Sequence, residues 1–212
     1  MDRDALFALV VDERLRLCDQ LDAVEPEVWD RPSLCAGWRV RDVLAHLVTL
    51  QDIPTRRFVI GTVGLKGFHR RADRFAREYG QRTPADLLAR YRLLARSRRT
   101  PPVIGPIAPL TDIVVHDLDI ARPLGLAPAC SDQAVRTVLD ALSRGLPGFT
   151  PRRLVRDLRF EATDRPWTGG PGDQLVSGPA TDLVLALSRR PAGAEPLHGP
   201  GAATLRSRLD AH

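Results

Sequence analysis

Hydrophobic residues recur every three or four positions through most of the first 144 residues, which is the spacing of helices that bury one face. Capping residues and prolines mark where several of these helices begin and end. The pattern predicts helices over residues 2–22, 40–53, 83–98, 110–122 and 131–144. Residues 55–80 are basic and predicted to be helical at both ends, with Gly61, Gly64 and Gly67 loosening the middle.

The pattern changes after a break at residues 145–151. Residues 154–163 alternate apolar and polar side chains, which is typical of a strand. A turn at 167–172, a short strand at 173–177 and a helix at 181–189 follow. We therefore expect an α+β protein with a helix bundle over residues 1–148 and a small α/β domain over residues 149–212.

Composition places the chain among ordinary globular proteins. Its 212 residues are 43% hydrophobic and 27% charged, which is sufficient for a packed core. The net charge is +5, but Lys66 is the only lysine, and such an arginine bias is typical of a GC-rich genome. The basic stretches fall on predicted helices and alternate with apolar residues, so we expect no nucleic-acid partner.

Targeting signals and cysteines point to one compartment. The charged start lacks the apolar core of a signal peptide, and no apolar run approaches the roughly 20 residues of a membrane helix. Cys18, Cys35 and Cys130 are widely spaced and form no CxxC pair, which argues against a structural zinc knuckle. We predict a cytoplasmic protein with no membrane partner, as a monomer or a homodimer.

Two of the five histidines lie inside apolar helical runs. His46 lies in the run Val-Leu-Ala-His-Leu-Val and His116 in the run Ile-Val-Val-His-Asp-Leu, whereas His69, His198 and His212 lie in basic, loop or terminal positions typical of the surface. A buried histidine needs partners for its ring nitrogens, and a hydrogen-bonded core histidine is the simplest interpretation of either one alone.

Spacing adds a second interpretation. Asp112 lies four residues before His116, so both side chains leave one face of one helix and can chelate one ion. His46 could supply a third ligand from a facing helix, as metal sites in helix bundles are commonly built. Two histidines and one carboxylate with an open position are typical of a catalytic divalent metal. Asp42 is a rival carboxylate, or a partner that orients the His46 ring.

Two segments carry a family resemblance. Residues 33–47, Ser-Leu-Cys-Ala-Gly-Trp-Arg-Val-Arg-Asp-Val-Leu-Ala-His-Leu, and residues 112–125, which begin Asp-Ile-Val-Val-His, resemble the mycothiol-dependent maleylpyruvate isomerase family of the DinB-like superfamily. The resemblance extends to residues 150–212, which look like the small C-terminal domain of that family. It implies a four-helix bundle that holds Zn²⁺ or another divalent metal through His46, Asp112 and His116, with mycothiol as cosubstrate.

The sequence departs from the family at two positions. Asp112 is one methylene shorter than the glutamate often found there, and Arg39 replaces a capping Thr or Ser at the helix start. Trp38 could line the pocket or pack in the core, and Arg122 could bind an acidic substrate or only complement a helix end. Cys35 is more typical of packing than of catalysis.

The resemblance implies an enzyme that uses a low-molecular-weight thiol to isomerise, or to add sulfur to, a small electrophilic metabolite, which can be acidic. The alternatives are a metal-dependent hydrolase, or a non-enzymatic binding or regulatory protein whose metal is structural or absent. An open coordination position would distinguish the enzymes from the binding protein.

Overall fold

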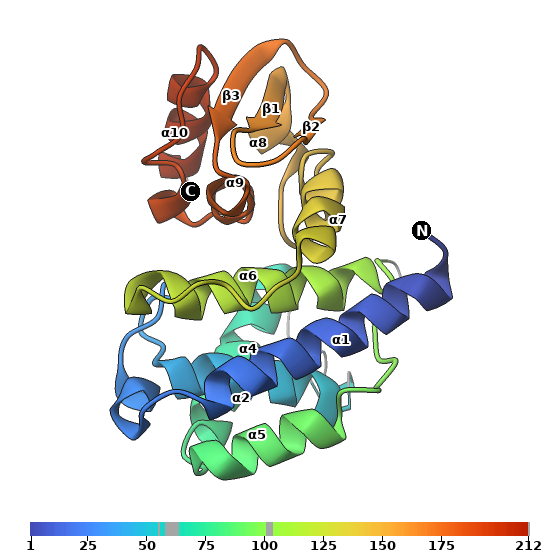
Figure 1. The fold of residues 1–212 in the computed structure, drawn as a ribbon, viewed down its shortest axis with the longest axis vertical. Coiled ribbons are helices and arrows are strands. Elements are labelled where there is room, and N and C mark those ends of the chain that lie inside the picture. The colour runs from blue at the N-terminus through green and yellow to red at the C-terminus, as the bar shows by residue number, and fades with distance from the viewer. Residues whose placement is uncertain (55, 58–63, 101–103, 212) are drawn as a thin grey trace. The chain divides into compact units, whose positions relative to one another are not determined.

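The computed structural model describes residues 1–54, 56–57, 64–100 and 104–211. The chain folds into two compact units, Met1–Cys130 and Ser131–His212. The first unit is helical (Figure 1), and its elements are α1 (Arg3–Asp22), the 3-10 helix η1 (Pro26–Asp30), α2 (Val40–Asp52), α4 (Gly64–Tyr79), α5 (Pro84–Leu93) and α6 (Ile107–Leu124).

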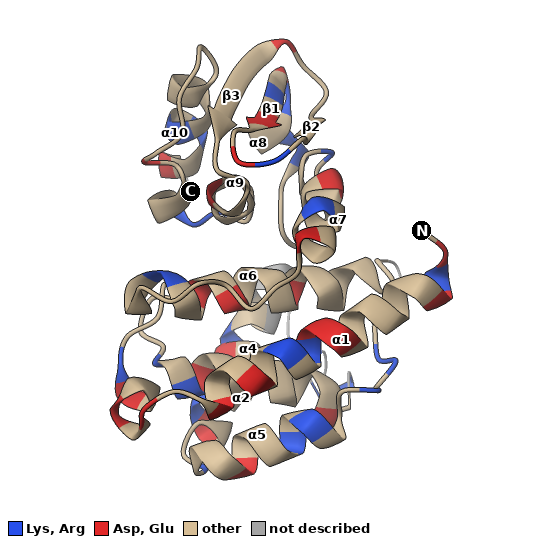
Figure 2. Cartoon of the chain, viewed as in Figure 1, with Lys and Arg blue, Asp and Glu red and all other residues tan. Residues whose placement is uncertain are grey.

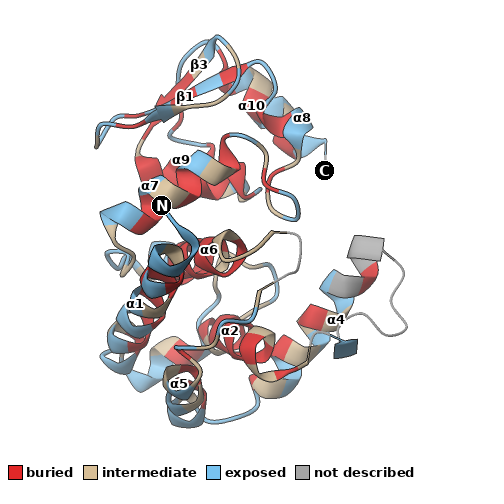
Figure 3. Ribbon diagram, turned by 90° about the vertical axis from the view of Figure 1, so that its right-hand side faces the viewer, coloured by how far each residue is buried: buried red, intermediate tan, exposed pale blue. Residues whose placement is uncertain are grey.

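The core of the first unit lies between α1, α2, α5 and α6. Helix α1 packs against α5 and α6, and α2 packs against α4, α5 and α6. Both α2 and α6 are buried over most of their length (Figure 3). Helices buried on several sides have few solvent-facing positions, so the polar side chains that they carry inward need a structural or chemical role.

The predicted helices exist, but two of their ends differ from the prediction by more than two residues. Helix α5 ends at Leu93, earlier than the predicted Arg98. The buried Arg14 Nη1 donates to the carbonyl oxygens of Ala95 and Ser97, both at 2.8 Å, and so holds the chain in a turn there. Helix α6 begins at Ile107, earlier than the predicted Leu110. Proline is tolerated at Pro109 because the N–H groups of the first turn make no hydrogen bonds within the helix.

The predicted loosening of residues 55–80 is wrong in part. Helix α4 runs continuously from Gly64 to Tyr79 and contains Gly67. Packing against α2 outweighs the low helix propensity of glycine at these positions. Gly61 lies outside the described residues.

The second unit is the smaller α/β part of the chain. It contains α7 (Asp132–Leu142), α8 (Arg152–Val155), β1 (Leu158–Ala162), β2 (Thr168–Gly169), β3 (Gln174–Gly178), α9 (Ala180–Leu187), the 3-10 helix η2 (Pro191–Gly193) and α10 (Ala202–Asp210). The strand order is β2-β1-β3, with β1 antiparallel to β2 and parallel to β3. The α+β fold class is therefore confirmed.

Two details of the second unit correct the sequence analysis. Leu154 and Val155, at the start of the predicted strand, belong to α8 instead, so β1 begins only at Leu158. The predicted turn at 167–172 contains β2, in which Gly169 pairs with Phe160. The two compact units divide between Cys130 and Ser131, before α7; the sequence predicts a domain boundary after residue 148.

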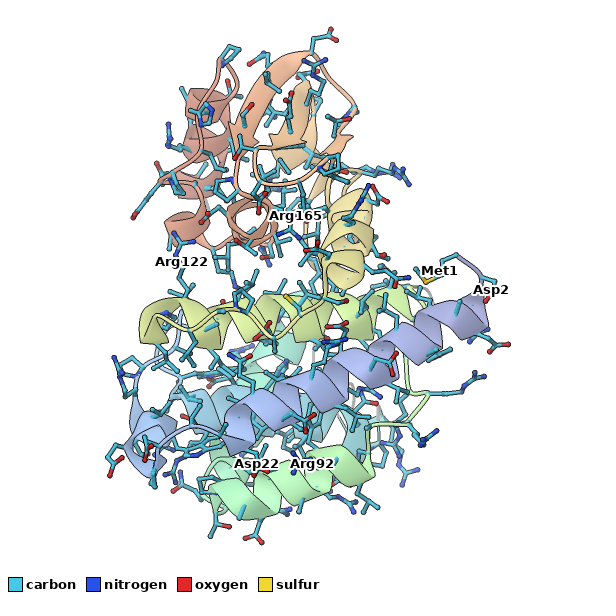
Figure 4. All side chains as sticks on the ribbon, in the orientation of Figure 1. Met1, Asp2, Asp22, Arg92, Arg122 and Arg165 are labelled. Carbon is cyan, nitrogen blue, oxygen red and sulfur yellow. The ribbon has the colours of Figure 1, made fainter. Side chains whose placement is uncertain are left out.

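Charged side chains on the first unit alternate in sign. Acidic and basic residues are interspersed on α1 and α5 (Figure 2). Arg92 reaches from α5 to Asp22 on α1, at 3.2 Å, and to Asp19, at 2.9 Å (Figure 4). Among the described residues, none of the helices combines the length and the apolar character required to cross a bilayer.

Candidate metal centre

Helix α2 places His46 inside the bundle. Its first turn is fixed by Asp42, whose carboxylate accepts from the Arg39 backbone N–H (3.0 Å) and from the Arg39 guanidinium (2.9 and 3.0 Å). This is the half of a capping box that the third helical residue supplies, whereas the Arg39 guanidinium cannot accept from the Asp42 N–H as a Thr or Ser hydroxyl would. The Asp42 N–H donates instead to the Arg39 carbonyl, at 3.0 Å. A Cβ at Gly80 would lie 2.1 Å from Asp42 Oδ1, so the chain after α4 approaches this pair closely only because residue 80 is glycine.

Helix α6 carries three polar residues at positions i, i+4 and i+7. Asp112, His116 and Asp119 therefore project from the same face of the helix. Asp112 is half-buried, His116 is 6% exposed and Asp119 is fully buried. Burying two carboxylates and an imidazole is costly unless each finds a hydrogen-bonding or ionic partner.

The structure brings His46, Asp112 and His116 together. One ring nitrogen from each histidine and one carboxylate oxygen of Asp112 all lie within 4.8 Å of one another. The two imidazole rings meet edge to face, with centroids 5.0 Å apart. Small side-chain adjustments would allow all three atoms to lie roughly 2.0–2.2 Å from one zinc ion, which is the usual length of imidazole and carboxylate bonds to zinc.

The Nδ1 atom of His116 faces Asp119 and Cys35. His116 Nδ1 lies 2.9 Å from Asp119 Oδ2, and Cys35 Sγ–H donates to the same oxygen at 3.1 Å. Burial disfavours the charged imidazolium, but the neighbouring Cys35 and Asp119 outweigh this effect and raise the pKa of His116 to about 10. A cation bound at this ring must therefore displace a proton.

Trp38 lies against both histidines. Its ring centroid is 5.1 Å from that of His46 and 6.3 Å from that of His116. The indole Nε1–H donates to Asp73 on α4, at 2.6 Å. Gly37 has φ of 75°, in the left-handed region that favours glycine, and this turn presents Trp38 to the site. Trp38 is half-buried, so it lines the site rather than filling a sealed core.

Other candidates from the sequence lie elsewhere or act differently. Asp42 is engaged by Arg39, and neither potential metal-binding group among the described residues includes it. Arg122 is exposed in the last turn of α6. His69 and His198 are exposed, as expected, and His212 lies outside the described residues.

Asp119 and the placement of Cys35 were not predicted from the sequence. Asp119 could have been found, because it lies three residues after His116 and so on the same helical face. Cys35 gave no comparable signal, because no periodic pattern relates its loop to α6. Its position depends on a backbone hydrogen bond from Leu34 N to Asp119 O, at 2.9 Å.

The donor set of the site suits a divalent cation. Two imidazoles and one carboxylate are borderline ligands of the kind that bind zinc and similar metals. A metal-bound histidine commonly donates its other ring N–H to a carboxylate. Asp119 is placed to be that carboxylate for His116, because it contacts Nδ1. The residues present therefore fit a metal held by three protein ligands.

Comparisons with known proteins identify related sequences and structures. The sequence profile of the family described as the mycothiol maleylpyruvate isomerase N-terminal domain matches residues 10–101, which include His46 but end before Asp112. A crystal structure of the mycothiol-dependent maleylpyruvate isomerase is similar, with a TM-score of 0.61, 14% identity, and coverage of 95% of this chain and 94% of that one.

A histidine-to-alanine mutant of the same isomerase gives a TM-score of 0.58 at 14% identity, with 90% of each chain covered. No curated protein sequence matches the chain. At this identity the structural likeness shows the fold alone.

Proposed function

We propose that this chain, residues 10–101 of which match the mycothiol maleylpyruvate isomerase N-terminal domain family, is a metal-dependent enzyme that uses a low-molecular-weight thiol such as mycothiol. Its reaction is an isomerisation or an S-transfer on a small electrophilic metabolite, which can be acidic. The observation that carries the proposal is the convergence of His46, Asp112 and His116 within 4.8 Å.

These three side chains would hold Zn²⁺ or another divalent cation. When bound, such a cation lowers the pKa of a thiol beside it, so that the thiolate is the nucleophile at neutral pH. Three protein ligands leave a position for an exogenous sulfur, which a closed four-ligand site would not. An external thiol is then the source of the nucleophile, and the small-molecule substrate is its second partner.

The remaining residues of the site position its parts. In the neutral ring that a bound cation requires, Asp119 would accept from Nδ1–H of His116, and Nε2 would carry the lone pair for the ion held with His46 and Asp112. Trp38 covers the two histidine rings and limits the approach of water, while its bond to Asp73 holds the indole in place. A planar electrophile could stack against the exposed part of this ring.

Calorimetry on the metal-loaded and metal-free protein tests the thiol. The metal-loaded protein should bind mycothiol, or its cysteinyl-glucosaminyl fragment, at least tenfold more tightly than the metal-free protein. The matched oxygen analogue, with serine in place of the cysteinyl group, should lose most of this difference, because it lacks the sulfur. Equal affinity of the two protein forms, or no binding by either, would contradict the proposal and favour the hydrolase or the binding protein.

A further inference from the structure

His116 belongs to two donor groups. The first is the proposed metal centre with His46 and Asp112, and the second consists of Cys35, His116 and Asp119. A neutral imidazole has one nitrogen with a lone pair and one that carries hydrogen. The ring can therefore donate a lone pair to one group at a time.

The second group has the geometry of one face of a tetrahedron. Cys35 Sγ lies 3.1 Å from Asp119 Oδ2 and 3.7 Å from His116 Nδ1, and the two latter atoms are 2.9 Å apart. Zinc bonds of about 2.3 Å to sulfur and about 2.0–2.1 Å to nitrogen and oxygen would place the same atoms about 3.3–3.6 Å apart. Each distance needs to change by only a few tenths of an ångström.

The loop that carries Cys35 is held against α6. Leu34 N donates to the Asp119 carbonyl at 2.9 Å, Cys35 N donates to Ser33 Oγ at 3.1 Å, and Ser33 N donates to the Trp38 carbonyl at 3.0 Å. The three donor atoms are thus positioned in advance of any ligand. Preorganisation of this kind lowers the entropic cost of binding an ion.

We propose that Cys35 Sγ, His116 Nδ1 and Asp119 Oδ2 form a second cation site, which takes a thiophilic divalent ion such as Cd²⁺ or excess Zn²⁺. Filling it removes His116 from the first site and so displaces the ion held with His46 and Asp112. The sulfur ligand gives the second site its preference for soft cations. The displacement, but not the second site itself, rests on the proposed function.

The exchange balances in protons and charge. The Cys35 thiol proton leaves to solvent as the sulfur binds the ion, and the Nδ1 proton of His116 is replaced by a proton on Nε2. The dipositive ion is then matched by one thiolate and one carboxylate, with a neutral imidazole as the third ligand. A net neutral site is favourable here, because Asp119 and His116 are almost completely buried.

Cadmium titration of the reduced, metal-free protein tests the second site. The ultraviolet charge-transfer absorption of a cadmium–thiolate bond should grow to one equivalent per chain in the wild type. Cys35→Ser should lose it, whereas Cys130→Ser, the matched control at the other half-buried cysteine, should retain it. No absorption in the wild type, or equal absorption in Cys35→Ser, would overturn the proposal.

A further titration separates this site from the proposed function. His46→Ala should keep the cadmium–thiolate absorption, since His46 is not in the second group, and loss of the absorption in this variant would count against the second site. In protein loaded with one zinc ion, cadmium should release that zinc in step with the absorption. Both ions bound at once, with the absorption fully developed, would refute the displacement and leave the proposed metal centre standing.

Discussion

At the scale of single residues, the hydrogen bond between His116 and Asp119 determines which ring nitrogen is available. Asp119 is fully buried, so its carboxylate interacts with the imidazole in a low-dielectric environment. The same oxygen also accepts from Cys35. Proton placement on His116 therefore depends on a residue that would not itself bind the ion in the proposed centre.

Asp119→Asn should weaken metal binding. The amide oxygen still accepts from His116 Nδ1, but without the negative charge that makes the imidazole a better ligand, so we expect a loss of about 10–100-fold in affinity. Competition with a chromogenic chelator measures the affinity. The control is Asp117→Asn, which should keep the affinity of the wild type. The Asp117 carboxylate accepts from Cys130 N–H at 2.8 Å and belongs to neither donor group. Equal affinities in Asp119→Asn and the wild type would show that Asp119 has no such role.

At the scale of secondary structure elements, buried ionic residues fix helix ends. Arg14, which is 1% exposed, links α1 to the chain after α5 through Ala95 O and Ser97 O. Burial lowers the pKa of this guanidinium from its ordinary value, yet the two carbonyls keep it bonded. Such a residue is costly to bury and more costly to remove.

Arg14→Met should destabilise the protein by about 1–3 kcal/mol, because it leaves two carbonyl groups at the end of α5 without their donor. Denaturant unfolding followed by circular dichroism measures this change. Arg74→Met, at an exposed position of α4, is the control and should shift stability by less than about 0.5 kcal/mol. A similar small shift for both variants would show that the Arg14 bonds contribute nothing.

The ion pair between Asp52 on α2 and Arg90 on α5 makes the free energy of unfolding depend on pH. Its hydrogen bond from Arg90 lowers the pKa of Asp52 below the ordinary value. The stabilising contribution is therefore fully present above the unfolded pKa of about 3.9 and is lost as the pH falls through the lower folded pKa. Asp52→Asn should be less stable than the wild type at pH 7, and the difference should shrink below about pH 4 in unfolding titrations. A difference that grows on acidification would contradict this assignment.

Helix existence could be predicted from the sequence, while helix ends and strand pairs could not. Helical periodicity is a local signal, so α1, α2, α6 and α7 were found. The early end of α5 depends on Arg14, 81 residues away from Ala95 in the chain. The short β2 likewise forms only because β1 offers a free edge to Thr168 and Gly169. Such tertiary contacts leave no periodic trace in the sequence.

At the scale of the whole molecule, the chain consists of two compact units, with the boundary in the sequence between Cys130 and Ser131. Helix α7 buries Ala134, Val135, Val138 and Leu139 and packs against α9. Trp167 Nε1–H also donates to Asp140 on α7, at 2.9 Å. These contacts place α7 within the C-terminal unit, although its helical periodicity resembles that of the bundle.

A fragment of residues 131–212 should therefore fold, and one of residues 149–212 should not. Loss of α7 exposes the apolar surface of α9, and each large side chain left exposed forfeits about 1.5–3 kcal/mol. Near-ultraviolet circular dichroism of Trp167 reports fixed packing in each fragment. Cooperative unfolding of the shorter fragment with the same Trp167 signal would place the boundary after residue 148 instead.

The candidate ligands were found from the sequence because Asp112 and His116 share a helix face, and because both histidines interrupt apolar runs. Which atoms converge depends on how α2 and α6 pack, and the sequence alone left Asp42 as a rival. The ion pair between Asp42 and Arg39 removes that ambiguity. That these ligands hold a metal stays a prediction.

Elemental analysis of the purified protein tests the metal centre most directly. The wild type should contain close to one divalent ion per chain, and His46→Ala and His116→Ala should each lose it while circular dichroism shows that the helices remain. His69→Ala, which removes an exposed histidine of α4, should retain the full amount. Full retention of the ion in both His46→Ala and His116→Ala would contradict the proposed centre.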